Sequence, residues 1–268
     1  FRHDREAVGR DGEKFYWSRL YAGETRGGLF TSLCEFDVDD EDAAFADAEE
    51  RMSATPIRLA VGNRASAMAH DFVVALYSGD IDAAAAVYSD QVVYDDRRRL
   101  GGDPINGGSA VRDAIERFTQ NYNRFELSTT AVRGDLLQLA HHRWSDDAGN
   151  QSTGFILSEI APDGKVIYDG RFDDDDFAQA YRELERRYLA GEGAAFATNG
   201  WTLVTFLEAM NVLDVEAARR VCQPTCRWLS PPSTLTTQER SLDEYFRWLE
   251  ERARQVSSVN NFFSAIHW

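Results

Sequence analysis

The segment YDDRRR, residues 94–99, combines residue types that can carry acid–base chemistry. Asp95 or Asp96 could act as a general base, with Arg97 stabilising developing negative charge. Arginines that directly follow carboxylates lower the carboxylate pKa and so weaken the base. The alternative is a solvent-exposed strand end in which arginines neutralise aspartates, as is usual for charge runs. We therefore expect this segment to form a polar rim instead of a catalytic base.

The second candidate is the pair of histidines in AHHRW, residues 140–144. On a β-strand His141 and His142 must point to opposite faces of the sheet, and His142 shares its face with Trp144. One of them could serve as a base in a pocket, and a structural or surface histidine is the alternative. The pattern leaves open which of the two faces the pocket.

Four consecutive aspartates, Asp173 to Asp176, precede an amphipathic segment, residues 177–188, and could bind a divalent cation. A calcium loop spreads its ligands over about twelve residues with a turn glycine between them, which this run does not do. Carboxylates at the start of a helix can cap free backbone N–H groups and meet the positive end of the helix dipole. We therefore predict side-chain capping, and expect neither a metal nor a cofactor.

The composition limits the possible partners. The 268 residues are 43% hydrophobic and 12% aromatic, which is enough for two globular cores. A net charge of −16 repels nucleic acid and anionic lipid, so the expected partner is a small apolar ligand or a protein. No apolar run approaches the roughly 20 residues needed to span a membrane, and no signal segment opens the chain, so we expect a cytoplasmic protein. Cys34, Cys222 and Cys226 fit neither a disulfide framework nor a complete zinc pattern, and are predicted to pack as small hydrophobic residues.

The chain contains an internal repeat. FDVDDEDAAFADAEERM, residues 36–52, aligns without a gap with FDDDDFAQAYRELERRY, residues 172–188, and residues 206–221 align with residues 72–87. This predicts one intact unit, residues 60–190, flanked by the second half of a copy at residues 1–54 and the first half at residues 194–268. We predict that the two halves pair into a second unit, because each alone would expose a torn sheet edge. The chain begins inside a predicted strand, so we expect it to be part of a longer polypeptide.

The intact unit is predicted to contain two helices, a strand, a third helix, four strands and a final helix. Helical spacing of apolar residues marks the first three helices, at residues 66–79, 81–89 and 109–122. Alternation and turn residues mark the strands, at residues 91–96, 124–132, 136–144, 153–161 and 165–172. Ser109 is the expected N-cap of the third helix. The predicted fold class is α+β, a cone-like, curved antiparallel sheet with helices packed on one face.

Four segments, YSDQVVYDDRRRLG, AVRGDLLQLAHHRW, APDGKVIYDGRFDDDD and AYRELERRYLAGEGA, resemble the SnoaL-like (polyketide cyclase-like) branch of the nuclear transport factor 2-like superfamily. The resemblance covers residues 60–190 and, in halves, both flanks. It implies a cone-shaped fold with a pocket between sheet and helices, which hosts isomerases, epoxide hydrolases, polyketide cyclases and non-catalytic partners. It also implies modules that occur in tandem in actinobacterial multidomain regulators. The residues expected to line the pocket are Phe72, Leu76, Tyr77, Tyr94, Arg97, Phe118, His142, Trp144 and Phe155.

The two copies keep the pattern of the fold but not its polar residues. The constant offsets of the repeat place Trp228, Leu229, Ser230 and Pro231 opposite Tyr94, Asp95, Asp96 and Arg97, and place Arg5 and Glu6 opposite His141 and His142. Such differences between the copies favour a role in binding or packing over a reaction that both copies catalyse.

We therefore predict a non-catalytic module that binds a small ligand or a protein, serves as an accessory part of a larger regulatory protein and could form a homo-oligomer. The alternative is an isomerase, cyclase or hydrolase of the ketosteroid isomerase or polyketide cyclase type. It would use Asp95, Asp96 or His142 as its base, with Tyr94 or Arg97 assisting.

Overall fold

The structure is a computed structural model that describes residues 1–52, 61–229 and 239–266. Ser230, Pro231, Trp268 and the expected boundaries at residues 54 and 60 lie outside these residues. The chain divides into two compact units, one formed by Phe1–Leu59 with Gly193–Trp268 and the other by Ala60–Glu192. We call them the split unit and the central unit. Within the described ranges, no helix has both the length and the apolar character needed to cross a membrane.

The central unit begins with helices and continues into a sheet. Its elements are α2 (Arg64–Tyr77), α3 (Ile81–Ala86), β4 (Tyr88–Asp96), β5 (Ile105–Asn106), α4 (Gly108–Asn121), β6 (Arg124–Arg133), β7 (Leu137–Ser145), β8 (Gln151–Ile160), β9 (Val166–Phe172) and α5 (Phe177–Ala190). The predicted order of elements is confirmed, with the short strand β5 added before α4.

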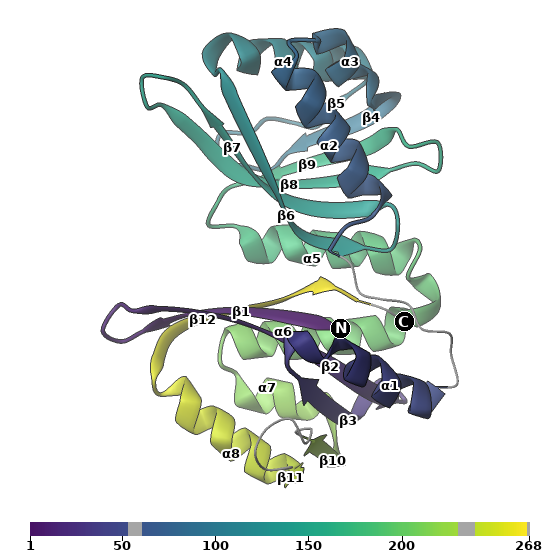
Figure 1. Cartoon of the computed structure of the whole chain (residues 1–268), viewed down its shortest axis with the longest axis vertical. Helices are drawn as coiled ribbons and strands as arrows, with labels where there is room; N and C mark the ends of the chain where they lie inside the picture. Colours follow the sequence, from purple (N-terminus) through teal and green to yellow (C-terminus); the bar gives the residue numbers. More distant parts are fainter. Residues whose placement is uncertain (53–60, 230–238, 267–268) are drawn as a thin grey trace. The chain divides into compact units, whose positions relative to one another are not determined.

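The six strands of the central unit form one sheet in the order β5-β4-β9-β8-β7-β6. Figure 1 shows α2, α3 and α4 on one side of this curved sheet and α5 on the other. The α+β class is confirmed, but two details differ from the prediction. β4 pairs with β9 in parallel, because the rest of the unit, not a hairpin, connects them. Helices also cover both faces, and we call the face toward α2, α3 and α4 the inner face and the face toward α5 the outer face.

Local sequence explains where these helices begin and end. Asn63 and Ser66 form a reciprocal capping box at the start of α2, and the Asp80 side chain accepts the Ala83 N–H at the start of α3. Gly79, between the two helices, adopts a φ of 73°, which glycine tolerates best. The predicted N-cap of α4, Ser109, is wrong, because α4 starts one residue earlier, at Gly108, and Gly107 occupies the cap.

The inner face carries the apolar core of the central unit. Side chains from all three helices pack on this face, and the strands contribute many of its aromatic residues. The buried members include Phe72, Ala84, Val111 and Ile115 from the helices and Val92, Tyr94, Phe125, Trp144 and Ile156 from the strands. This core covers the polar residues described in the next section.

The outer face is joined to α5 by a buried ion pair. The side chains of Arg133 on β6 and Glu185 on α5 are 0% and 2% exposed. Arg133 Nε donates to Glu185 Oε1 at 2.9 Å, and Nη2 donates to the Tyr181 hydroxyl at 2.6 Å. Burial opposes the charge of Arg133, but Glu185 raises the arginine pKa above its ordinary value. Each charge is therefore tolerable only in the presence of the other.

The split unit draws its sheet from both parts of the chain. Its elements are β1 (Arg2–Gly9), β2 (Lys14–Arg26), β3 (Leu29–Phe36), η1 (Val38–Asp40), α1 (Glu41–Met52), η2 (Ala194–Phe196), α6 (Ala197–Asn211), α7 (Val215–Arg220), β10 (Cys222–Leu229), β11 (Glu239–Ser241), α8 (Leu242–Ala253) and β12 (Val256–Ala265). The strand order is β11-β10-β3-β2-β1-β12, with β1 antiparallel to β12 and β3 parallel to β10. Strand for strand, this is the arrangement of the central unit.

Strand registers allow the two sheets to be compared residue by residue. Starting from the repeat match of Phe36 with Phe172, the pairs Leu20–Phe36 and Phe155–Phe172 make Leu20 equivalent to Phe155. The next pairs, Arg2–Leu20 and His141–Phe155, then make Arg2 equivalent to His141.

His3 is consequently the equivalent of His142. The expected matches with Arg5 and Glu6 are wrong, because the hairpin of the split unit is longer: residues 2–20 correspond to residues 141–155. A histidine therefore occupies the same place in both sheets, fully buried in the central unit and partly buried in the split unit.

Replacing Arg133 with methionine should strongly destabilise the central unit. Removing one partner of a buried ion pair leaves Glu185 without its counter-charge, a loss of about 3–5 kcal/mol in unfolding free energy. Urea unfolding of the whole chain measures the loss. The double variant Arg133→Met, Glu185→Leu should recover much of it.

Arg143→Met is the matched control, because Arg143 forms an exposed ion pair with Glu126. Such pairs contribute about 0–1 kcal/mol. Equal losses for Arg133→Met and Arg143→Met would show that the buried pair does not hold α5.

Candidate functional site

The inner face of the central unit holds a buried carboxylate paired with an arginine. Asp169 of β9 is 1% exposed, and it accepts hydrogen bonds from Arg171 Nε and Nη2 at 2.5 and 2.8 Å. The Tyr88 hydroxyl donates to the same carboxylate at 3.0 Å. Burial opposes the charge of Arg171, but Asp169 raises the arginine pKa. Burial and then the Asp169 charge raise the pKa of Tyr88, so the phenol stays protonated.

A second carboxylate–arginine pair lies at the end of β4. Arg98 donates to Asp96 through Nε at 2.8 Å and through Nη2 at 2.6 Å. Burial opposes ionisation of Asp96, but hydrogen bonds and charge from Arg98, with a further contribution from Arg171, lower its pKa. Arg171 lies 5.5 Å from the ring centroid of Tyr94, on the same strand as Asp96. Both acids of the inner face are thus neutralised by arginine.

His142 is the polar group of this face that lacks a complete set of partners. It is 1% exposed, and its Nδ1 atom has no hydrogen-bond partner among the described residues. Burial and then the charges of Arg171 and Arg98 lower the pKa of His142 to about 2, although a hydrogen bond with the Gly154 backbone acts in the opposite direction. The imidazole is therefore neutral near pH 7.

Gly154 makes room for this imidazole. A Cβ at residue 154 would lie 2.4 Å from the carbonyl oxygen of Phe172 and 3.2 Å from His142 Cε1. Only glycine allows the strand to approach both groups so closely. The position of the histidine ring is thus set by backbone packing.

Aromatic rings connect His142 with the surface of the unit. The Phe125 ring lies 6.4 Å from His142 and 4.4 Å from Trp144, and Trp144 stacks on Phe118 at 5.4 Å. Phe118 and Tyr122 lie on an open groove of about 680 Å³, whose other lining residues are Arg117, Asn121, Asp146, Asn150 and Gln151. The lining is mostly polar, so the groove is not itself an apolar small-molecule pocket.

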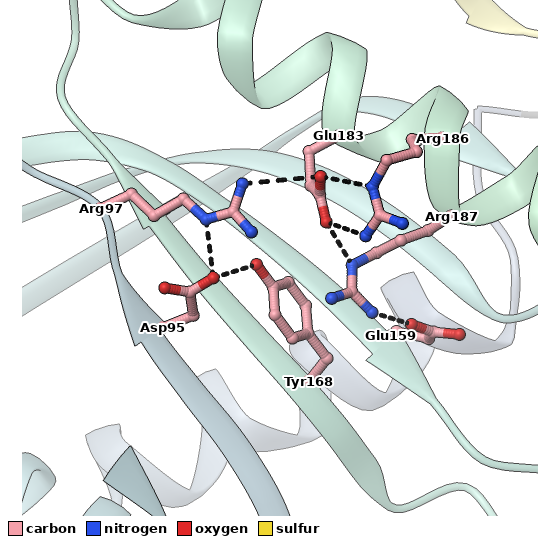
Figure 2. Close-up of polar contacts among 7 residues, drawn as sticks. All are labelled: Asp95, Arg97, Glu159, Tyr168, Glu183, Arg186 and Arg187. Carbon is pink, nitrogen blue, oxygen red and sulfur yellow. Dashed lines mark hydrogen bonds and ion pairs between the residues drawn. The ribbon is translucent and has the colours of Figure 1, made fainter. Parts of the chain in front are cut away.

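Asp95 and Arg97 lie on the outer face, away from His142. The Tyr168 hydroxyl donates to Asp95 at 2.9 Å, and Arg97 contacts both Asp95 and Glu183 of α5 (Figure 2). The remaining members of this network are Glu159, Arg186 and Arg187. The network links α5 with β4, β8 and β9, so Asp95 and Arg97 support the packing of this helix.

The inner face brings together five of the residues expected to line a pocket, namely Phe72, Tyr94, Phe118, His142 and Trp144. Leu76 packs beside them, partly buried.

Phe155 and Tyr77 lie elsewhere. The Phe155 ring contacts His141 and Phe177 of α5, each at 5.2 Å, which places it on the outer face. Tyr77 is 63% exposed, and its hydroxyl donates to the Phe125 carbonyl at 2.7 Å. His141 shares the outer face with Phe155, so His142 is the histidine of the inner face.

The aspartate run does not cap α5 through its side chains. Asp176 occupies the N-cap position but makes no side-chain cap hydrogen bond, and the same is true of Asp37 before η1. Instead, Asp173 accepts the backbone N–H of Arg99 at 2.9 Å, and the Arg99 guanidinium contacts Asp175. The predicted side-chain capping is wrong: Arg99 engages Asp173 and Asp175, and Thr153 donates to Asp174. Oxygens of Asp173, Asp175 and Asp176 lie within 4.8 Å of one another, and Arg99 balances part of their charge.

Sequence reasoning missed the cluster of Tyr88, Asp169 and Arg171. A signal was present in VIYDGRF, where Asp169 and Arg171 lie two residues apart on one face of an otherwise apolar strand. Charges on a buried strand must be paired, so this spacing could have indicated the ion pair.

No family model matches the chain, and no curated protein matches it. The similar solved structures include an NTF-2-like protein of unknown function from Burkholderia xenovorans (20% identity, 41% of this chain, 84% of that chain, TM-score 0.35). They also include an epoxide hydrolase from Mycobacterium tuberculosis (19%, 50%, 95%, 0.33) and a Δ5-3-ketosteroid isomerase from Mycobacterium sp. (13%, 43%, 96%, 0.37). Such low identities and TM-scores say nothing about shared chemistry, which rests on the geometry of the site.

Replacing His142 with phenylalanine should remove a pH-dependent loss of stability. The pKa of about 2 in the folded state lies below the unfolded value of roughly 6.5. As the pH falls below about 6.5, the unfolded chain binds more protons than the folded chain, so the unfolding free energy decreases. Between pH 7 and pH 5 this loss is about 2 kcal/mol.

Urea unfolding of both proteins at the two pH values measures this difference. The variant should show the smaller loss on acidification. An identical pH dependence in the two proteins would contradict a neutral, buried His142.

Proposed function

We propose that the central unit is a non-catalytic module that binds a small apolar ligand on its inner face. The observation that supports this proposal is the unpartnered Nδ1 of His142, an atom buried on the inner face beside aromatic rings and paired charges. An unsatisfied buried polar atom costs about 1–3 kcal/mol, so its presence needs an explanation. A ligand that hydrogen-bonds to Nδ1 would offset this cost.

The protonation state of His142 defines the group that such a ligand must carry. A neutral imidazole has one N–H donor and one bare nitrogen acceptor. Nδ1 has no partner among the described residues, so we propose that it is the bare acceptor and that the ligand presents a hydroxyl or an N–H group within an apolar frame.

The row of aromatic rings between the groove and His142 gives the ligand a route into the core. The groove at Phe118 and Tyr122 is open, and the rings of Trp144 and Phe125 continue from it toward His142. We propose that the ligand enters at this groove and displaces Phe118, which is only partly buried. Aromatic side chains suit this role, because they contribute large apolar contact areas.

The alternative is an isomerase, cyclase or hydrolase, as the names of several similar structures suggest for those proteins. A general base works best when its pKa lies near the operating pH. On the inner face, the pKa of His142 is about 2 and the pKa of Asp96 is lowered by Arg98, so both are weak bases. These values favour binding over turnover.

We also propose, from the sequence, that this module belongs to a larger regulatory protein. A protein partner and self-association are further proposals of the same kind. The central unit can bind a ligand under any of them, because the inner face is complete within Ala60–Glu192.

1-Naphthol and 1-methoxynaphthalene are matched probes, which differ in the hydroxyl that would donate to Nδ1. We expect 1-naphthol to bind the whole chain about tenfold more tightly, a difference of about 1.4 kcal/mol. Isothermal titration calorimetry measures both affinities. His142→Phe should bring the ratio close to one, and the control His141→Phe, on the outer face, should leave it unchanged.

Equal affinities for the two probes would contradict the proposal. So would a loss of the preference for 1-naphthol in His141→Phe but not in His142→Phe. A substrate whose turnover falls about a hundredfold or more in Asp96→Asn or His142→Phe would establish the enzyme instead.

A further inference from the structure

The split unit carries charge where the central unit carries aromatic rings. The registers make Arg5 equivalent to Trp144 and Asn261 equivalent to Phe125. In the central unit these positions form a ring pair 4.4 Å apart. Polar groups in a core position are costly unless they are satisfied or used.

An asparagine pair holds two of these polar groups in place. Asn261 is 1% exposed, and its Oδ1 accepts from Arg5 Nε at 2.5 Å and lies 3.0 Å from His3 Nε2. Asn211 of α6 fixes Asn261, because its Oδ1 accepts the Asn261 backbone N–H at 2.5 Å and the side-chain Nδ2 at 2.8 Å. His3 and Arg5 are therefore preorganised side by side.

The Arg5 guanidinium has unused hydrogen-bonding capacity. Among the described residues, only its Nε donates a hydrogen bond, and no carboxylate lies within ion-pair distance of Arg5. Glu35, an acid on the same face, forms an ion pair with Arg19 at 3.4 Å and interacts with Arg5 over a longer distance. Trp17 lies 5.2 Å from the guanidinium carbon, so its ring helps to orient the group. The two Nη groups match the geometry of a carboxylate.

Arg5 and His3 line a cavity whose other walls are almost entirely apolar and aromatic. Its volume is about 20 Å³, which is room for one water molecule. The aromatic walls include Trp228, which stacks on Tyr245 at 3.7 Å, and Phe1, whose partly buried ring lies 4.5 Å from Phe263. An aromatic ligand therefore has to displace the Phe1 ring, because the cavity itself holds only about one water molecule.

We propose that the split unit binds a small aromatic carboxylate, with its carboxylate on the Nη groups of Arg5 and its ring among the aromatic walls. This ligand differs in charge from the neutral ligand proposed for the central unit. The inference rests on the split unit alone, so it stands or fails independently.

Benzoate and its neutral isostere benzamide test the proposal on the whole chain. Isothermal titration calorimetry should give at least tenfold tighter binding of benzoate, with quenching of tryptophan fluorescence. Arg5→Gln should remove this preference and leave benzamide unaffected. Arg2→Gln is the matched control, since Arg2 lies on the same strand but its side chain faces away and pairs with Asp4.

Equal affinities of benzoate and benzamide, absence of saturable benzoate binding, or an equal loss in Arg2→Gln would overturn the proposal. If Arg5→Gln does not fold, the ratio of benzoate to benzamide affinity in the unaltered protein still tests the proposal. His142→Phe separates the two sites, because a loss of benzoate binding in that variant would place the anion in the central unit and contradict the assignment to Arg5.

Discussion

The strict alternation of side chains along β7 is the constraint on which the central unit depends. His142 and Trp144 enter the inner core, whereas His141 faces α5, because neighbouring residues of a strand point to opposite faces. A slip of one residue against β8 would exchange these sets and bury the wrong groups. Gly154, opposite His142, prevents such a slip because no other residue fits between the imidazole and the Phe172 carbonyl.

The two faces meet this constraint in different ways. The outer face anchors α5 with charge, through the buried pair of Arg133 and Glu185 and the network shown in Figure 2. The inner face keeps its own charges paired, Asp169 with Arg171, and leaves a neutral imidazole beneath aromatic rings. The split unit repeats this plan with His3, whose pKa burial lowers to about 3, but places Arg5 where the central unit has Trp144. The same fold thus carries different side chains at equivalent positions of its two inner faces.

Periodicity alone predicted the order of elements and the shared face of His142 and Trp144, because both depend on local spacing. It did not predict that Asp95 and Phe155 face α5, since this depends on which face each helix covers. The equivalence of His3 and His142 was also missed, because a longer hairpin changes the offset between the copies. The buried partners of Arg133 come from a distant helix, so no local pattern indicates them.

The most direct test of this account is the tautomer of His142, observed by nitrogen-15 NMR of histidine-labelled protein at pH 7. We predict a neutral ring with a protonated Nε2 and a bare Nδ1, whose resonance moves toward that of a hydrogen-bonded nitrogen when 1-naphthol is added. A protonated imidazolium, or a neutral ring with the proton on Nδ1, would contradict the claim that the inner face offers a free acceptor to a ligand.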